Sequence, residues 1–209
     1  RSLSGQPQCH ARAVYSGAGS GGSGWLKLCS GAAVSKVGTV GIVSNMSIQI
    51  RLISAADLAA VVALQDSCYS DNLYEPPELL ARRLAAAPDS CWLAENPAGE
   101  LLAYLFCYPS LAGKVAPLGS PFQVASKPEL LYLHDMAVSA KARGLGLASR
   151  LLQQAEYFAR EQGLTRLALV AVQGSLSYWQ RQGFLVQDTL CPDAGAALQS
   201  YTGEQARYM

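Results

Sequence analysis

Apolar and polar residues follow a regular pattern from residue 46 onward. Segment 48–52 alternates between the two types, which predicts a half-buried strand. Ser54 and Asp57 have the spacing of a capping box, so a first helix is expected to begin there. A second helix is predicted over about 76–87, because a proline pair suits its first turn and Pro88 stops it.

The middle of the chain predicts four strands. Segments 90–95 and 100–108, joined by the turn NPAG, indicate a hairpin whose second strand is apolar at nearly every position and therefore covered on both faces. Segments 130–138 and 166–172 indicate two more buried strands. The connection 109–128 has neither period and is broken by Pro and Gly, so a binding loop and a disordered segment are both open interpretations.

The rest of the pattern completes the fold class. A long amphipathic helix follows the 130–138 strand and ends at Gln162 before Gly163. A short helix is expected over 174–182, a strand over GFLVQD (183–188), and EQARYM is a candidate last edge strand. The order β-α-α-β-β-β-α-β-α-β predicts an α/β fold, a mixed sheet covered by helices, with too few βαβ repeats for a doubly wound sheet.

Composition divides the chain into two parts. The 209 residues are 50% hydrophobic, enough for one substantial core. Residues 1–47 hold nine Gly and nine Ser, and no acidic residue precedes Asp57. We therefore expect a flexible segment over 1–46 and a folded domain over 47–209. The first segment is open to three interpretations, an expression leader or over-extended gene start, a native extension, or a transit peptide.

Charge and cysteine usage exclude several function classes. A net charge of +1, from 16 basic and 15 acidic side chains, gives no field to attract nucleic acid. No apolar stretch approaches the roughly 20 residues that span a bilayer. The six cysteines are scattered without a CxxC pair, and two histidines leave little for a metal site. These features predict a cytoplasmic protein without a metal, a nucleic-acid partner or a membrane partner.

The stretch SAKARGLGLAS, between the 130–138 strand and the long helix, carries the candidate chemistry. Residues 143–148 would present main-chain N–H groups at a helix N-terminus, with Gly144 and Gly146 allowing close approach and Arg143 adding charge. This arrangement suits a pyrophosphate or a phosphate ester. A P-loop sequence is absent, and the dinucleotide fingerprint fails because its third glycine position is Ser149.

The strings LHDMAV, ARGLGLASRLL and SYWQRQGF together resemble the GNAT superfamily of acyl-CoA-dependent N-acyltransferases. The family signature Arg/Gln-x-x-Gly-x-Gly/Ala is matched by residues 143–148, and the resemblance covers about residues 48–190 in element order. It implies a mostly antiparallel sheet of six to seven strands with helices on both faces, splayed at its two middle strands. It also implies acetyl-CoA as cosubstrate, an amine acceptor attacking the thioester directly, and no metal.

The same resemblance assigns the coenzyme contacts. Main-chain N–H groups of residues 144–148 would hold the CoA pyrophosphate, and pantetheine would lie along the strand ending at Val138. The thioester carbonyl would lie against an N–H near Met136, which can stabilise an oxyanion. The implied cofactor-binding residues are Met136, Ala137, Val138, Arg143, Gly144, Leu145, Gly146, Leu147 and Ala148.

The attacking amine needs a base. His134 is the first candidate because it lies beside the expected thioester site and histidine exchanges protons near neutral pH. A core histidine satisfied by a carbonyl is the alternative, and a bulge would change the face that His134 occupies. Asp135 would face the opposite way on a regular strand. Glu75 could anchor a cationic amine or act as a remote base through water, or could be a solvated loop carboxylate.

The general acid departs from the family pattern. The family commonly has Tyr four residues before the Gly of the GF pair, and that position is Trp179 here. Indole supplies no proton at neutral pH, so either Tyr178 reaches in or solvent protonates the thiolate. Val172 replaces a frequent Asn. The sequence therefore predicts an N-acetyltransferase acting on a small molecule or peptide, as a monomer or homodimer. A non-catalytic CoA-binding domain and a domain for another phosphorylated ligand are the alternatives.

Overall fold

The computed structural model describes residues 48–68, 75–172, 174–201 and 206–209. The expected segment 1–46 lies outside the described residues. The strands are β1 (Gln49–Leu52), β2 (Cys91–Glu95), β3 (Leu101–Ser110), β4 (Leu130–Val138), β5 (Leu167–Ala171) and β6 (Arg207–Tyr208). The helices are α1 (Leu58–Cys68), α2 (Pro77–Ala86), α3 (Leu147–Glu161), α4 (Leu176–Arg181) and α5 (Ala194–Gln199).

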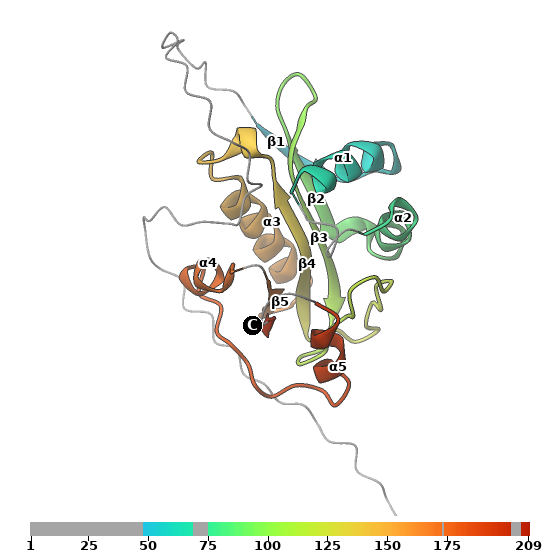
Figure 1. Ribbon diagram of the computed structural model, residues 1–209, viewed down its shortest axis with the longest axis vertical. Coiled ribbons are helices and arrows are strands. Elements are labelled where there is room, and N and C mark those ends of the chain that lie inside the picture. Colours follow the sequence, from blue (N-terminus) through green and yellow to red (C-terminus); the bar gives the residue numbers. More distant parts are fainter. Residues whose placement is uncertain (1–47, 69–74, 173, 202–205) are drawn as a thin grey trace, which may run out of the picture.

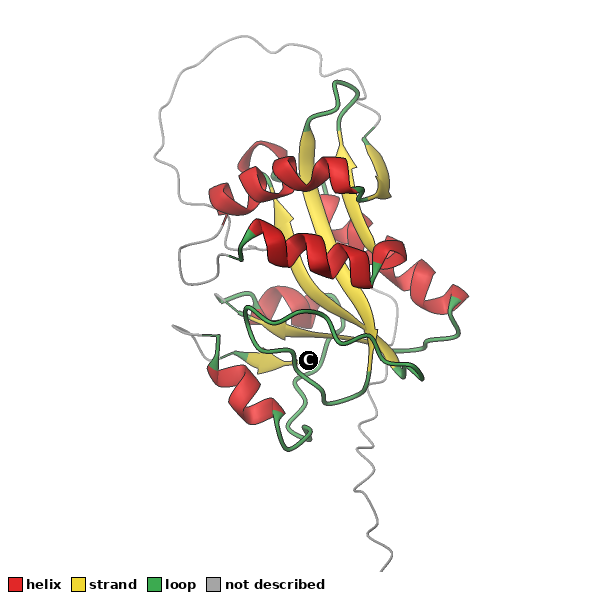
Figure 2. Ribbon diagram, turned by 90° about the vertical axis from the view of Figure 1, so that its right-hand side faces the viewer, coloured by secondary structure: helices red, strands yellow, loops and turns green. Residues whose placement is uncertain are grey.

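The strands form a mixed, mostly antiparallel sheet in the order β1-β2-β3-β4-β5-β6, in which only the β4–β5 pair is parallel (Figure 1). Helices α1 and α2 lie across one face and α3 lies behind the sheet (Figure 2). The fold therefore agrees with the predicted class and with the predicted helices on both faces.

Two hydrophobic layers hold the helices on the sheet, because successive side chains of a strand point to opposite faces. Tyr104 and Phe106 of β3 belong to the layer under α1 and α2. Leu105 of the same strand belongs to the layer under α3. On the α3 side, Trp92 meets Phe158 edge-on with ring centroids 5.5 Å apart.

Strands β4 and β5 diverge soon after they meet. Their register pairs only three residues, Leu131 with Leu167, Tyr132 with Ala168, and Leu133 with Leu169. Strand β4 continues to Val138 without β5 beside it. The predicted splay at the middle of the sheet is present.

Strand β4 contains a β-bulge at His134. Phe106 of β3 pairs with Asp135, and the next residue, Cys107, pairs with Leu133, so His134 is the extra residue. An extra residue interrupts the alternation of side chains. His134 and Asp135 therefore share the α1/α2 face, because the bulge left open by the sequence is present and the opposite facing expected of a regular strand does not apply.

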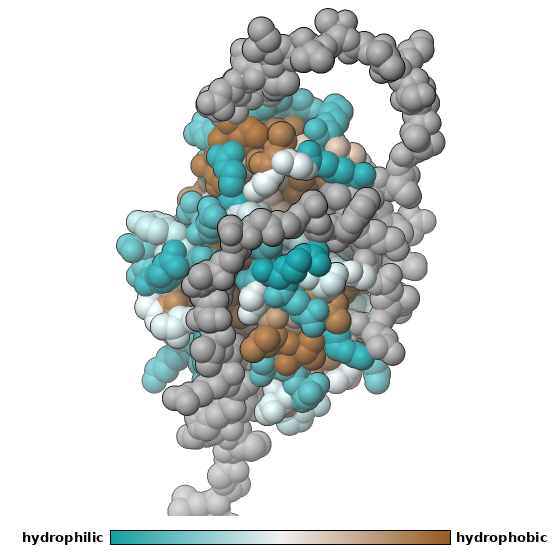
Figure 3. Space-filling view, turned by 90° about the vertical axis from the view of Figure 1, so that its left-hand side faces the viewer, coloured by the Kyte–Doolittle hydropathy of each residue, from teal (hydrophilic) through white to brown (hydrophobic). Residues whose placement is uncertain are grey.

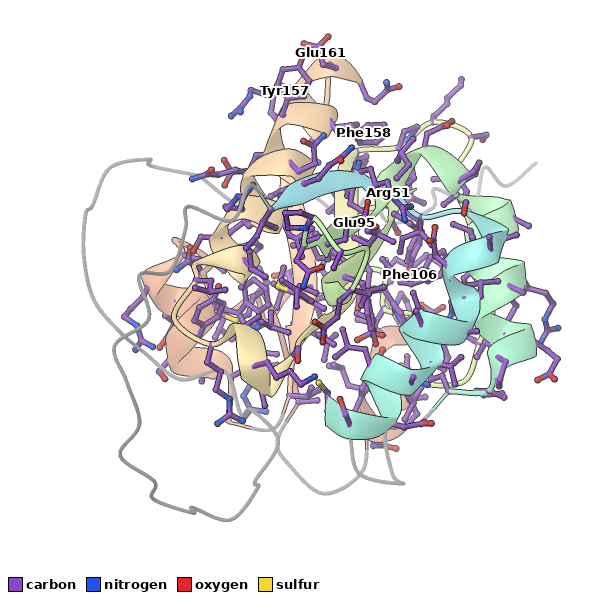
Figure 4. The ribbon with its side chains drawn as sticks, turned by 90° about the horizontal axis from the view of Figure 1, so that it is seen from above. Arg51, Glu95, Phe106, Tyr157, Phe158 and Glu161 are labelled. Carbon is purple, nitrogen blue, oxygen red and sulfur yellow. The ribbon has the colours of Figure 1, made fainter. Side chains whose placement is uncertain are left out.

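The first strand and helix are joined by the predicted capping box. The main-chain N–H of Ser54 donates to Asp57 Oδ2 at 2.8 Å, in a 3₁₀ turn that precedes α1. Arg51 lies beside Glu95 of β2 (Figure 4) and bonds it, and it also bonds both oxygens of Asp57. These charge-assisted bonds fix the start of α1 against the edge of the sheet.

The C-terminal part differs from the prediction. Segment 183–188 is not a strand, although Phe184 is buried and Leu185 exposed as the alternation requires. Strand β6 occupies the open edge of β5, and Gln187 of the segment donates its N–H to Tyr208 O of β6 at 3.0 Å. Helix α5 was not predicted.

The outer surface is mixed in character. On the side that carries α3 and α4, hydrophilic residues separate the apolar ones among the residues drawn in colour (Figure 3). Within the described ranges, no helix combines the length and hydropathy needed to cross a bilayer. Cys91 and Cys107 are buried free thiols, as expected of cysteines in apolar strands.

Candidate active site

The turn before α3 has the geometry of an anion cradle. Gly144 and Gly146 have φ values of 78° and 70°, in the left-handed region that favours glycine. A Cβ built on either residue would meet no protein atom within 4 Å, so open space lies over the turn. Gly146 is the N-cap of α3, and the N–H groups of the first helical turn have no preceding carbonyl within the helix.

The predicted cofactor residues of this turn differ in what they offer. Arg143 and Gly144 are exposed, whereas Leu147 and Ala148, the first two residues of α3, are buried in the layer between α3 and the sheet. The N–H of Leu145 already bonds Ala142 O at 3.3 Å. The donors available to a ligand are therefore those of the first turn of α3 rather than every N–H of residues 144–148.

The register of β4 sets the direction of its main chain. Ser139 N–H bonds Leu102 O at 2.8 Å, and hydrogen bonding to a neighbour alternates along an antiparallel pair. Ala137 therefore faces β3, while Met136 and Val138 direct their main-chain groups to the side from which β5 has diverged. This is the orientation that the expected pantetheine contacts require. Cys68, at the end of α1, lies with its Sγ 3.6 Å from Val138 O.

The side chain of His134 is enclosed on the α1/α2 face. It is 2% exposed, and Phe122 meets the imidazole edge-on with ring centroids 5.1 Å apart. Its Nε2 lies 3.5 Å from Glu75 Oε2. Its Nδ1 is buried and makes no hydrogen bond to a described residue.

Glu75 is a buried partner of Arg83. Its side chain is 4% exposed, Arg83 Nη2 bonds Oε1 at 2.6 Å, and Arg83 Nη1 bonds Oε2. Gly119 N–H provides a third bond to this carboxylate and donates to Oε1 at 3.0 Å. Burial raises the pKa of Glu75, but bonds and charge from His134 and Arg83 outweigh it and lower the pKa to about 2. The interpretation of Glu75 as a solvated loop carboxylate is wrong.

The Arg83–Glu75 pair also orders the connection 109–128. Arg83 donates to Ser120 O from Nε at 3.0 Å and from Nη2 at 2.7 Å. Its guanidinium carbon lies 5.1 Å from the centroid of the Phe122 ring. This connection is therefore a structured loop over the candidate base, and the disordered alternative is wrong.

Tyr178 and Trp179 lie side by side on α4. The Tyr178 hydroxyl is buried, and no described residue lies in hydrogen-bonding geometry to it. Burial raises the pKa of Tyr178, and the Ser149 hydroxyl at the start of α3 partly offsets this. Trp179 packs edge-on against Tyr178 and Phe184, with centroids 5.0 and 5.5 Å away. Trp179 therefore belongs to the hydrophobic layer on the α3 side of the sheet.

Asp135, beside His134, accepts a bond from the Tyr104 hydroxyl at 2.8 Å. One site residue escaped the sequence analysis. Arg83 is fully buried, and its signal was present in the sequence, because it occupies the apolar face of α2 together with Leu79, Leu80 and Leu84. A charged residue at such a position indicates a buried partner. Among the described residues, no group of side chains could hold a metal ion.

In a comparison with known protein families, one family model matches this chain. The model of the acetyltransferase (GNAT) family matches residues 58–184. A search of curated protein sequences found no significant match. Many solved structures are similar. The loading GNATL domain of CurA from Lyngbya majuscula has 14% identity and a TM-score of 0.61, over 77% of this chain and 94% of that one.

Two further structures show the same fold. Ard1 from Thermoplasma volcanium has 16% identity and a TM-score of 0.55, over 68% of this chain and 84% of that one. The GphF GNAT-like decarboxylase, in complex with isobutyryl-CoA, has 22% identity and a TM-score of 0.54, over 66% of this chain and 72% of that one.

Proposed function

Because the chain belongs to the GNAT family of acetyltransferases, we propose that it transfers an acetyl group from acetyl-CoA to a primary amine of a small molecule or peptide. The observation that carries the proposal is the pair of left-handed glycines under open space at the start of α3, beside the divergence of β4 and β5. A diphosphate fits the first feature and an extended pantetheine arm fits the second.

The coenzyme would be held mostly by main chain. The first turn of α3 binds the pyrophosphate, with Gly144 and Gly146 allowing close approach and Arg143 adding a positive charge. Pantetheine lies along β4 and bonds Met136 and Val138 as an added strand would. The thioester is then delivered to the α1/α2 face, where His134 lies. The reduced thiols of Cys91 and Cys107 agree with action in the cytoplasm.

The reaction needs one bond formed and one broken. The amine nitrogen attacks the thioester carbonyl carbon, and the developing oxyanion accepts a hydrogen bond from main chain near Met136. His134 takes the proton that the amine loses as the C–N bond forms. The C–S bond then breaks with its electron pair on sulfur. Tyr178 or solvent protonates the thiolate.

A non-catalytic CoA-binding domain is the second candidate. The observations that favour it are Trp179 at the usual acid position and the 2% exposure of the His134 side chain. A domain of that kind binds CoA and releases no thiol.

The two candidates separate in one assay. The protein is incubated with acetyl-CoA and a panel of amines, free thiol is followed with time, and the amine product is weighed by mass spectrometry. Product with an added acetyl group supports the transferase. A raised melting temperature with CoA and no product supports the binding domain. If CoA does not raise the melting temperature and no acetylated product forms, both candidates are contradicted.

The mass of the product must be measured, because a similar fold occurs in a GNAT-like decarboxylase and the fold alone does not determine the reaction. Thiol release alone would not distinguish transfer to an amine from hydrolysis of the thioester.

A further inference from the structure

The two nitrogens of His134 have different surroundings. Nε2 faces the Glu75 carboxylate at 3.5 Å, while Nδ1 is buried and bonds to no described residue. A neutral imidazole carries one proton, and an ionised carboxylate only accepts hydrogen bonds. The proton is therefore favoured on Nε2, which leaves the lone pair on Nδ1.

The carboxylate that sets this preference is itself held on several sides. Arg83 binds both of its oxygens and Gly119 N–H binds one of them. Arg83 in turn is fixed by its two bonds to Ser120 O. The lowered pKa of Glu75 keeps it ionised at neutral pH. Rotation of Glu75 away from the imidazole would break buried charge-assisted bonds.

We propose that Arg83 and Glu75 are positioning residues that fix His134 with its proton on Nε2, so that Nδ1 is the atom that takes the proton from the attacking amine. This inference rests on the proposed function. It assigns Glu75 a role other than anchoring the amine, because the carboxylate is 4% exposed and is already surrounded by Arg83, Gly119 and His134.

The proton balance follows from this assignment. As the C–N bond forms, Nδ1 takes the proton from nitrogen and His134 becomes an imidazolium. Its positive charge lies against the Glu75 carboxylate, which stabilises it. The imidazolium then returns the proton to solvent when the product leaves.

A purely structural histidine would explain less. Leaving a buried nitrogen without a partner costs about 1–3 kcal/mol, which a packing role does not recover. A nitrogen kept for the substrate amine gains its partner when the acceptor binds. Unpaired buried polar atoms are uncommon enough that each calls for a reason.

The tautomer is measurable in the wild-type chain. With only two histidines in the sequence, the ring ¹⁵N resonances of His134 are assigned by comparison with His10→Gln. Nitrogen–carbon-bound-proton correlation spectra of the free protein at pH 8 should show a protonated Nε2 and a bare Nδ1. A protonated Nδ1 overturns the proposal, and this measurement does not depend on any variant folding.

Kinetics test the consequence. Glu75→Gln leaves one oxygen where two now bind Arg83, so its amide nitrogen turns toward Nε2 and the tautomer changes. We expect kcat to fall by about 10- to 100-fold with little change in the KM for acetyl-CoA. The control is Glu129→Gln, which removes the carboxylate that bonds Ala112 N–H at 2.9 Å at the other end of the same loop.

Three outcomes decide the matter. Added to His134→Gln, the Glu75→Gln change should lower kcat no further, because both residues act through one proton transfer. An additive loss, or an unchanged kcat in a folded Glu75→Gln, overturns the positioning role. Failure of the proposed function is recognised separately, as CoA binding without an acetylated product while His134 still shows the Nε2–H tautomer.

Discussion

At the scale of single residues, three glycines share one backbone conformation and differ in their surroundings. Gly144, Gly146 and Gly163 have φ values of 78°, 70° and 71°, and an added Cβ meets nothing at any of them. The first two precede α3 and the third follows it. Any other residue in this conformation costs about 1–2 kcal/mol, so the chain contains its own control for a ligand at one end of the helix.

Gly146→Leu and Gly163→Leu should therefore destabilise the protein by a similar amount, about 1–2 kcal/mol in urea unfolding. Only Gly146→Leu should abolish CoA binding in calorimetry, because its side chain fills the space over the first turn of α3. Equal CoA affinity in the two variants would contradict the assignment of the pyrophosphate site.

Tyr178→Phe tests the departure from the family pattern. If Tyr178 protonates the thiolate, kcat should fall about 10-fold or more while the edge-on contact with Trp179 remains. An unchanged kcat, measured by steady-state thiol release, assigns that proton to solvent instead. Trp179→Phe, which keeps an aromatic ring in the packing, is the matched control.

The residue scale is also where sequence reasoning reached its limit. The largely apolar run 130–138 predicted the strand with correct bounds, yet strand alternation could not fix the face of His134, because a bulge depends on pairing with β3. The burial of Glu75 was equally hidden, since Gly119, one of its partners, is 44 residues away.

At the scale of elements, helix α5 explains the order of the loop 111–129. Ser200, directly after the helix, accepts a bond from Leu118 N–H at 2.8 Å. The Tyr201 hydroxyl, one residue on, donates to Ala116 O at 2.8 Å. Helix α5 was missed because six residues carry too little periodicity. Without its contacts, the sequence allowed both a binding loop and a disordered segment after β3.

Tyr201→Phe should loosen this loop. The substitution leaves the buried Ala116 carbonyl without that donor, at a cost of about 1–3 kcal/mol. Amide hydrogens of residues 112–122 should exchange faster with deuterium, while those of α3 are unchanged. Tyr157→Phe on the exposed side of α3 (Figure 4) is the control, and the same acceleration there would argue against a specific role for Tyr201.

At the scale of the whole molecule, buried and partly buried ion pairs link stability to acid pH. The bond from Arg51 lowers the pKa of Asp57, and Arg83 and His134 lower that of Glu75 to about 2. A carboxyl with a lowered folded pKa adds stability above its unfolded pKa and loses it as pH falls through the folded value. Below pH 5 the unfolded chain therefore binds more protons than the native protein.

The free energy of unfolding should accordingly fall between about pH 5 and pH 2. Glu75 accounts for roughly 2–3 kcal/mol of this loss. Glu75→Gln should be less stable at pH 7 and should show a shallower decline, measured by urea unfolding across this range. Glu161→Gln, at the exposed end of α3, should keep the wild-type slope. A Glu75→Gln curve parallel to wild type would contradict the linkage.

The three-residue register between β4 and β5 affects local opening of the native state. Strands β1 to β4 form one extended hydrogen-bonded unit, and β5 with β6 forms a second, smaller one. Their junction is short, so local opening between β4 and β5 should precede global unfolding of the sheet. Acetyl-CoA bound between β4 and β5, as proposed, would hold the two units together. Release of the coenzyme after each turnover would allow the junction to open again.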